Sequence, residues 1–567
     1  MDRQAFLQTP ACSMPQNGLI VEISVRLREL ACVFLGLTVS CLGSAGADLK
    51  RGEPLAFSYQ SEVDGTLQPY MVYLPKSLPE DKPWPLVVAL HGTSGSHQTF
   101  LMSTKKYDKA KLMKAAEKHR MAILCPEGRG NTEWWGIGEN DVFRAIGDFQ
   151  KRAPIDKNRI YLTGHSMGGG GTTYIALRNP GFFAAAAPMV GTLHFDLAEN
   201  ARYTPFYFLV GSREIGPRKL FIKRLADKME ALGYERIHEI VPGADHRSFV
   251  PDAWDRVFAW FSDKRLVRQP DRITHAAEIP KHGWAYWVKI DAMERPGTIA
   301  RIDARRDGNE FRITSENIAV FRVFPDHAAI DPHQPLVVHI NGNRLDPGKE
   351  VSGKEIVFEQ MADQWSVRTA PLNEPKRGNY RYAAVARAEQ AMTVKSSTDY
   401  SLAFWAADAL RAASGADIAF QLTAHYRGVG IQPGEVTEDD LIQCIRPFLQ
   451  PLCTVSLSGR QIVKILDGNV SQRWGAIFVS GMSYRFDPQA PAGKQIVEHS
   501  LDPDRKYSLC LGENDILRKS VRVPKGISLS KYQRTSIWNH AAYYGHAVRQ
   551  GTLRVDHLDR RQKVVGN

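Results

Sequence analysis

A serine stands at the centre of a glycine-rich turn, Gly164-His165-Ser166-Met167-Gly168. Strand-like residues 159–163 precede the turn, and helix-like residues 172–178 follow it. This order presents a serine hydroxyl at a reacting centre, because glycines let the strand and helix backbones pass closely. The helix N-terminus favours negative charge that develops beside it. The pattern predicts Ser166 as a nucleophile, and the alternative is a glycine-rich loop that contains a serine by chance.

Two later loops carry the partners that such a serine needs. Glu214 follows the strand-like residues 206–210, and His246 follows the strand-like residues 236–241. A neutral histidine can accept the serine proton and later return it, while a carboxylate fixes the histidine tautomer and stabilises the imidazolium. We therefore predict His246 as the base and Glu214 as the acid. Ordinary surface or capping roles are the alternatives for both.

Two other acids compete with Glu214 for this role. Asp196 is the substitute if Glu214 is not the acid. Asp245 is adjacent to His246 in the chain, so we do not expect its carboxylate to reach round to the imidazole.

The turn after the strand-like residues 86–90 has the sequence His91-Gly92-Thr93-Ser94-Gly95. We expect the backbone N–H groups of Thr93 and Met167 to bind an oxyanion. The same edge would carry the substrate pocket, which we assign to His91, Gly92, Trp134 and Trp135. For the two indoles, packing inside the protein is an equal alternative.

Strand-like and helix-like runs alternate along residues 48–268. Short continuous apolar runs such as residues 86–90 are typical of buried parallel strands, and runs such as 142–151 have helical periodicity. This alternation predicts an α/β fold with a doubly wound parallel sheet, in which ligands bind at the carboxyl ends of the strands. The predicted nucleophile, acid and base all follow strand-like runs, so the fold would gather them at one edge.

This first segment resembles an α/β-hydrolase of the secreted esterase, polyhydroxybutyrate depolymerase and prolyl-oligopeptidase-like group. The residues that carry the resemblance are Leu90-His91-Gly92, Cys125-Pro126-Glu127-Gly128, Asn140-Asp141-Val142, the run from Asp156 to Gly169, and Gly243-Ala244-Asp245-His246. The resemblance implies ester or peptide hydrolysis through an acyl-enzyme. The family usually has an aspartate in the acid loop, where this chain has Glu214.

Residues 269–370 change to short alternating runs separated by turn residues such as Asp307-Gly308 and Asn341-Gly342. Strands this short and regularly spaced predict a small β-sandwich. Residues 371–387 contain Pro and charges and are interpreted as a linker. Neither segment contains a group of residues arranged for catalysis.

Residues 388–567 mix helical and strand-like runs, as an α+β domain does. The segment resembles the C-terminal domain of 5′-nucleotidases through Ala407-Asp408-Ala409-Leu410-Arg411, Gly415-Ala416-Asp417-Ile418-Ala419, Gly434-Glu435-Val436-Thr437, Leu457-Ser458-Gly459-Arg460-Gln461-Ile462 and Ser480-Gly481-Met482-Ser483-Tyr484. The resemblance implies a nucleoside site, in which Phe448 would stack on the base and Arg427 would contact ribose or phosphate.

Several departures from that family weigh against nucleotide hydrolysis. Gln450 stands where the family has an asparagine, and the late Gly-Gly-Asp-Gly-Tyr loop is not found. The partner metallophosphoesterase domain is missing, we find no metal-ligand spacing, and we expect no cofactor. Retained nucleoside binding and a purely structural or interaction role both stay open for this segment.

Residues 1–47 have the pattern of a signal peptide. Two arginines precede an apolar stretch, Leu30 to Leu42, that is too short to span a bilayer, and Ala45-Gly46-Ala47 is a cleavage site. We therefore expect a secreted or periplasmic protein that begins near Asp48, with a lipid anchor at Cys41 as the alternative. No other segment is apolar enough to cross a membrane.

The charge and cysteine content limit which partners and disulfides we expect. The 567 residues carry a formal net charge of +12, but Lys and Arg are scattered among Asp and Glu without a nucleic-acid motif. We interpret the charge as solvated surface and expect no nucleic-acid partner. Cys444 and Cys453 are close in sequence and are the first candidates for a disulfide, with buried free thiols as the alternative.

Together these features predict a secreted serine hydrolase that cleaves small or polymeric carboxylic esters. A serine peptidase of the prolyl-oligopeptidase-like type is the second hypothesis, because the same groups cleave peptides. The third is a nucleotide-binding or nucleotide-catabolism protein that acts through its C-terminal segment.

Overall fold

The computed structural model describes residues 49–567 except 105–106, 192–194, 349, 363, 374–383, 394–399, 423–429, 445–449, 471–476, 556–560 and 564–567. The predicted leader and its cleavage site lie outside the described residues, as do Arg427 and Phe448. Lys50–Asn567 cluster into one unit. Within the described ranges, no helix is both long enough and apolar enough to span a membrane.

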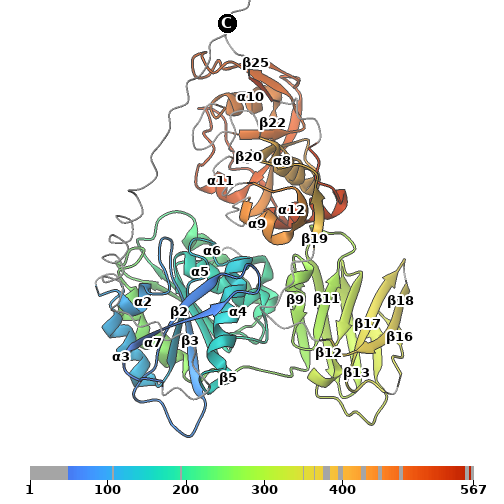
Figure 1. The fold of residues 1–567 in the computed structure, drawn as a ribbon. Helices are drawn as coiled ribbons and strands as arrows, with labels where there is room; N and C mark the ends of the chain where they lie inside the picture. Colours follow the sequence, from blue (N-terminus) through green and yellow to red (C-terminus); the bar gives the residue numbers. More distant parts are fainter. Residues whose placement is uncertain are drawn as a thin grey trace, which may run out of the picture. The chain divides into compact units, whose positions relative to one another are not determined.

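The first part of this unit is built on an eight-stranded sheet in the order β1-β2-β4-β3-β5-β6-β7-β8 (Figure 1). The strands are β1 (Pro54–Gln60), β2 (Leu67–Tyr73), β3 (Trp84–Leu90), β4 (Ala122–Pro126), β5 (Ile155–His165), β6 (Ala185–Met189), β7 (Phe206–Gly211) and β8 (Arg236–Val241). Only β2 runs antiparallel to its neighbours, and the strands from β4 to β8 are parallel. Every residue of β3 is buried, which is why its sequence is a continuous apolar run.

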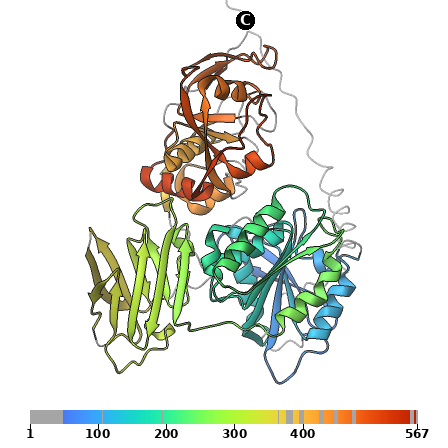
Figure 2. The same ribbon diagram turned by 180° about the vertical axis from the view of Figure 1, so that it is seen from behind.

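Helices cover both faces of the sheet (Figures 1 and 2). On one face lie α2 (Thr99–Met102), α3 (Lys109–His119) and α7 (Val250–Phe261); on the other lie α4 (Ile137–Gln150), α5 (Met167–Arg178) and α6 (Arg218–Ala231). The chain passes from β3 to β4 on one side of β3 and then returns to β5 on its other side. This reversal makes a switch point between β3 and β5, where the loops diverge and leave a place for a ligand.

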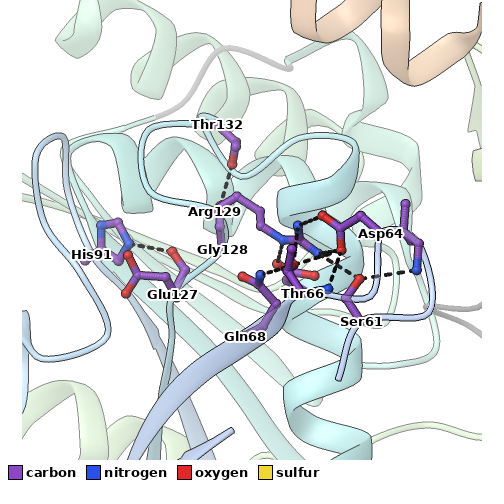
Figure 3. Close-up of polar contacts among 11 residues, drawn as sticks. Ser61, Asp64, Thr66, Gln68, His91, Glu127, Gly128, Arg129 and Thr132 are labelled. Carbon is purple, nitrogen blue, oxygen red and sulfur yellow. Dashed lines mark hydrogen bonds and ion pairs between the residues drawn. The ribbon is translucent and has the colours of Figure 1, made fainter. Parts of the chain in front are cut away.

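The loop after β4 is held against the β1–β2 hairpin by Arg129 (Figure 3). Its Nε donates to Asp141 Oδ2 at 2.6 Å, its Nη2 donates to Ser61 Oγ at 2.8 Å, and its Nη1 forms an ion pair with Asp64. The Asp141 side chain is only 3% exposed, and burial raises its pKa even though Arg129 opposes the shift. Arg129 therefore compensates a buried carboxylate and fixes the loop with one planar group.

The middle part consists of two five-stranded sheets around one apolar core. One sheet contains β10 (Trp284–Ala285), β11 (Val288–Ala292), β14 (Val320–Val323), β17 (Lys354–Met361) and β18 (Gln364–Pro371). The other contains β9 (Arg272–Ala277), β12 (Ala300–Asp307), β13 (Glu310–Glu316), β15 (Val337–Ile340) and β16 (Asn343–Leu345). Three short 3-10 turns, η1 (Phe195–Ala201), η2 (Pro280–His282) and η3 (Pro325–His327), connect elements of the first two parts. Apolar side chains of both sheets, such as Ile302 and Phe358, meet in the core, as the alternating pattern predicts.

The last part is a five-stranded sheet in the order β23-β20-β26-β22-β27, with smaller sheets beside it. Its strands are β19 (Ala384–Ala388), β20 (Ile418–Leu422), β21 (Gly434–Thr437), β22 (Pro451–Ser458), β23 (Ile477–Ser480), β24 (Tyr484–Phe486), β25 (Ile496–His499), β26 (Lys506–Gly512), β27 (Gln533–Trp538) and β28 (Arg561–Lys563). Its helices are α8 (Ser401–Ser414), α9 (Glu438–Cys444), α10 (Gly459–Asp467), α11 (Glu513–Leu517) and α12 (Asn539–Gln550).

Both faces of that five-stranded sheet are buried. Ala419 packs into one core with helices α8 and α12, while its neighbours Ile418 and Phe420 pack into a second core with α10. The strand β19 pairs with β21, so residues 384–387 of the predicted linker are part of a sheet. The mixed helix and strand content is as predicted, and the exact boundaries between the three parts stay predictions.

The described cysteines are free thiols. Cys125, Cys453 and Cys510 are buried and unpaired with another cysteine, so the predicted Cys444–Cys453 disulfide is wrong. Burial raises the pKa of Cys510 to about 12 and that of Cys125 still further. These thiols therefore act as small apolar core residues.

Buried charges occur where α4 meets segments that follow it in the chain. Glu139 of α4 is fully buried, accepts from Asn179 Nδ2 at 2.8 Å and lies 3.0 Å from His282 Nε2. Burial alone would raise the pKa of Glu139, but His282 and Lys281 lower it to about 2. Lys281 Nζ also lies 3.5 Å from Asp439 Oδ1 of α9. These pairs join all three parts of the unit through charges that are shielded from water.

We predict that Arg129→Met lowers the free energy of unfolding by about 3 kcal/mol, because it leaves the buried carboxylate of Asp141 without its cation. Urea denaturation followed by circular dichroism measures the change. The control is Arg460→Met, which removes an ion pair with Asp504 whose side chains are 59% and 85% exposed, and which we expect to cost less than about 1 kcal/mol. Equal midpoints for the two variants would contradict the role of Arg129.

Candidate active site

Ser166 lies in a strained turn between β5 and α5. Its φ of 61° and ψ of −113° are unusual for a residue with a side chain. The turn is held by the Ser166 N–H, which donates to the Met189 carbonyl at 2.9 Å, and by the Gly170 N–H, which donates to the Ser166 carbonyl at 3.0 Å. The sequence predicted this strand, turn and helix order, and the structure has it.

Glycines make the turn sterically feasible. A Cβ added to Gly168 would lie 1.9 Å from the Leu90 carbonyl oxygen, and one added to Gly164 would lie 2.5 Å from the Gly168 carbonyl oxygen. Both distances are far inside van der Waals contact, so no other residue fits without moving β3. The glycines on either side of Ser166 thus allow α5 to start directly beside the end of β3.

His246 bridges Ser166 and Glu214. Its Nε2 lies 2.9 Å from Ser166 Oγ, and its Nδ1 lies 2.8 Å from Glu214 Oε2. Because the carboxylate can only accept, Nδ1 carries the proton and Nε2 is left to accept from the serine hydroxyl. The Glu214 side chain is fully buried and also pairs with Arg218 at 3.1 Å. The structure therefore brings together the three side chains that the sequence singled out, from positions up to 80 residues apart.

Backbone contacts join the two loops that carry Glu214 and His246. The Arg213 N–H donates to the Ala244 carbonyl at 2.9 Å, and the Gly243 N–H donates to Ser212 Oγ at 2.8 Å. Gly211 passes so close to the second loop that a Cβ there would lie 2.4 Å from the Ala244 carbonyl oxygen. Glu214 and His246 thus lie on two loops that are hydrogen-bonded to each other through their main chains and Ser212. These bonds hold the two residues in their relative position.

The competing acids lie in other environments. Asp196, the substitute for Glu214, binds Lys228 at 2.8 Å, Arg534 at 2.6 Å and the Trp538 indole N–H at 3.0 Å. Asp245 accepts the backbone N–H groups of Arg247 and Ser248 in its own turn, and these bonds lower its pKa to about 2. The substitute Asp196 therefore pairs with other residues, and Glu214 is the carboxylate that contacts His246.

The two predicted oxyanion donors, Met167 and Thr93, lie at the start of α5 and in the turn after β3. Met167 is the first residue of α5, so its N–H has no partner inside the helix. Gly92 approaches Ser166, since a Cβ on it would lie 3.5 Å from Ser166 Cβ, and exposed Thr93 follows it in a turn closed by the Gly95 N–H and the Gly92 carbonyl at 2.9 Å. The turn after β3 is thus next to the serine, as its sequence predicted.

The proposed pocket residues His91, Trp134 and Trp135 are buried, with exposures of 1%, 0% and 5%. Trp134 packs against Gly171 of α5, and its Nε1 donates to the His91 carbonyl at 3.1 Å. His91 Nε2 lies 2.9 Å from the Glu127 carbonyl oxygen (Figure 3). The packing alternative therefore describes both indoles, and the expectation that Trp134 lines an open pocket is wrong because its whole surface is covered.

Sequence reasoning missed two residues at this site. Arg218 is the first residue of α6 and lies four positions after Glu214, and the short spacing of these opposite charges was an available signal for an ion pair. His165 is inside the serine motif, but its Nε2 contacts the backbone carbonyl of His246, 81 residues away. No local sequence pattern predicts a hydrogen bond between residues so far apart in the chain.

The structure does not describe the residues of the predicted nucleoside site. Arg427 and Phe448 lie outside the described residues, so the nucleoside site stays a prediction. Across the part of the chain that the structure describes, no cluster of three or more His, Cys, Asp or Glu side chains is arranged to hold a metal ion.

Comparison with known proteins gives two kinds of similarity. Residues 382–513 match the 5′-nucleotidase C-terminal domain family. A stretch of 147 residues is 27% identical to the bifunctional acetylxylan esterase/xylanase XynS20E of Neocallimastix patriciarum, and covers 25% of this chain and 21% of that protein. A stretch of 141 residues is 28% identical to poly(3-hydroxyalkanoate) depolymerase C of Paucimonas lemoignei, and covers 22% of this chain and 32% of that protein.

The chain thus spans a third or less of the length of these relatives. Among solved structures, the S-formylglutathione hydrolase of Staphylococcus aureus is 19% identical over 38% of this chain and 100% of its own, with a TM-score of 0.32. The protein therefore combines a segment similar to esterase and depolymerase sequences with a segment that matches the 5′-nucleotidase C-terminal domain family.

Proposed function

We propose that this protein is a serine hydrolase that cleaves carboxylic esters. The observation that carries the proposal is the position of His246, with one ring nitrogen 2.9 Å from Ser166 Oγ and the other 2.8 Å from Glu214 Oε2. The names of the two sequence relatives, an acetylxylan esterase and a poly(3-hydroxyalkanoate) depolymerase, support an ester as the substrate. We also propose that the chain is exported, on the strength of the leader pattern in residues 1–47.

In this mechanism Ser166 Oγ attacks the ester carbonyl carbon while His246 Nε2 takes the serine proton. The N–H groups of Met167 and Thr93 bind the negative oxygen of the tetrahedral intermediate. The C–O bond breaks as His246 returns the proton to the departing alcohol, and an acyl-Ser166 ester remains. Water then attacks that ester, His246 takes its proton, and the carboxylic acid leaves with Ser166 restored.

Glu214 supports the charge that forms on His246 during both steps. Its buried carboxylate accepts from Nδ1, so it fixes the tautomer and stabilises the imidazolium. Arg218 binds its second oxygen and holds the carboxylate in place. A peptide substrate is the second candidate, because the same groups cleave an amide through the same intermediates.

We predict that Ser166→Ala lowers kcat for p-nitrophenyl acetate and butyrate by about a thousandfold or more, since no nucleophile remains. A fluorophosphonate probe should label the wild type at Ser166 and leave this variant unlabelled. The control is Ser262→Ala, which removes a hydroxyl bonded to the Phe258 carbonyl just after α7 and should keep full activity. Labelling of Ser166→Ala, or an inactive wild type, would contradict the serine mechanism.

We predict that Glu214→Gln lowers kcat by about a thousandfold, because glutamine fills the site but cannot stabilise the imidazolium. The matched controls are Asp196→Asn and Asp245→Asn, which remove charges that the structure places on other partners. Both controls should keep kcat within about threefold of the wild type, measured on p-nitrophenyl butyrate. A large loss in Asp196→Asn together with an active Glu214→Gln would show that the acid is misassigned.

A second candidate function, nucleoside binding, is favoured by the family match of residues 382–513. We predict that calorimetric titration with adenosine gives measurable heat, and that Phe448→Ala weakens binding about tenfold or more, because stacking on one aromatic ring is worth about 1–3 kcal/mol. Absence of heat at millimolar adenosine would leave the segment with a structural or interaction role only.

A further inference from the structure

Beside the hydrogen bonds of Ser166, His246 and Glu214 lies a second series, which joins Tyr107, His165 and the His246 main chain. His165, the residue before Ser166, is 2% exposed, and its Nε2 lies 2.6 Å from the backbone carbonyl oxygen of His246. Its Nδ1 lies 3.1 Å from the Tyr107 hydroxyl. A carbonyl oxygen only accepts, so Nε2 of His165 carries a proton, and in the neutral ring Nδ1 accepts from the Tyr107 hydroxyl. The surroundings therefore select one neutral tautomer of His165.

Tyr107 is itself held firmly. It is 1% exposed, and burial raises its pKa to about 12, so the hydroxyl keeps its proton at neutral pH. Its ring packs edge-on against Phe100 at a centroid distance of 4.8 Å, and its carbonyl accepts the Trp254 indole N–H at 3.4 Å. The hydroxyl donor thus comes from the packed core between α2, α3 and α7, which gives His165 a rigid support.

His246 needs such a support from its backbone side. It lies on a loop whose neighbours Gly243 and Asp245 are exposed, and its own side chain is 31% exposed. Glu214 holds one ring nitrogen, but a bond at the ring does not fix where the main chain lies. The bond from His165 fixes the His246 carbonyl, and the two imidazoles lie with centroids 4.9 Å apart.

The bond from His165 links Ser166 to its base, because His165 is the residue before Ser166 and contacts the His246 main chain. Ser166 and His165 are consecutive, so the bond from His165 to the His246 main chain limits how far His246 can move from Ser166, in addition to the bonds that join its loop to the acid loop. An error of about 1 Å in the separation between Ser166 Oγ and His246 Nε2 costs about a hundredfold in rate. We propose that His165, supported by Tyr107, is a positioning residue that holds His246 at Ser166, an inference that rests on the proposed hydrolase function.

The test compares four variants of the full chain: His165→Met, His165→Gln, Tyr107→Phe and a control. His165→Met removes the donor at similar volume, and His165→Gln restores an amide N–H at about the same reach. The matched control is His275→Met, because His275 of β9 is 1% exposed and its Nε2 binds the His282 carbonyl at 2.7 Å, a bond of the same type outside this site. Kinetics with p-nitrophenyl butyrate, fluorophosphonate labelling rates and circular dichroism melting curves are recorded for each.

We expect His165→Met to lower kcat and the labelling rate about 10- to 100-fold with KM within about twofold, because the base is displaced while the substrate still binds. His165→Gln should recover at least half of the lost activity on a logarithmic scale. His275→Met should keep kcat at the temperature of the assay, whatever its melting temperature. Tyr107→Phe, which removes only the hydroxyl, should show a smaller loss than His165→Met.

Three results would overturn the inference while the wild type remains active and labelled: unchanged kcat in His165→Met, equal losses in His165→Met and His275→Met, or a His165→Gln variant no better than His165→Met. If His165→Met does not fold, the comparison rests on Tyr107→Phe, and wild-type kinetics in that variant would sink the proposal. An inactive and unlabelled wild type would instead contradict the hydrolase function itself.

Discussion

The close approach of two backbones at the end of β3 is the constraint on which the site depends. The Leu90 carbonyl oxygen occupies the space where a Cβ of residue 168 would be, at 1.9 Å. Only glycine allows α5 to begin there, directly after Ser166 with its positive φ. The strain at Ser166 is held by the surrounding sheet, because β3 and residues 160–165 of β5 are buried and both strands are hydrogen-bonded to their neighbours.

Once the serine is fixed, its partners are positioned by loops that hold one another. The acid loop after β7 and the histidine loop after β8 are joined by a backbone bond from Arg213 to Ala244 and by the Gly243 N–H, which donates to the Ser212 hydroxyl. Parallel strands end at the same edge, so both loops start within reach of the serine turn. The side-chain bonds of His246 then complete a geometry that the main chain has largely set.

Buried ion pairs determine which segments of the protein can lie together. Arg129 with Asp141, and Arg178 with Glu278, form ion pairs whose carboxylates are almost wholly shielded from water. Such pairs add little net stability compared with apolar packing, but losing one partner is costly because a lone buried charge remains. They therefore restrict which segments can lie together, and Arg129 does this for the loop that carries Trp134.

The sequence by itself determined the local chemistry. Glycines on either side of Ser166 indicate a tight turn from the local sequence alone, and the order of strand-like runs placed Glu214 and His246 at the same edge of a parallel sheet. The fold type of each part followed from hydrophobic periodicity, which depends on neighbours in the chain. Tertiary structure decided the rest, because those outcomes depend on distances between residues far apart in sequence. Only the tertiary structure shows that Trp134 packs against α5, that Asp196 forms an ion pair with Arg534, and that His165 contacts the His246 carbonyl.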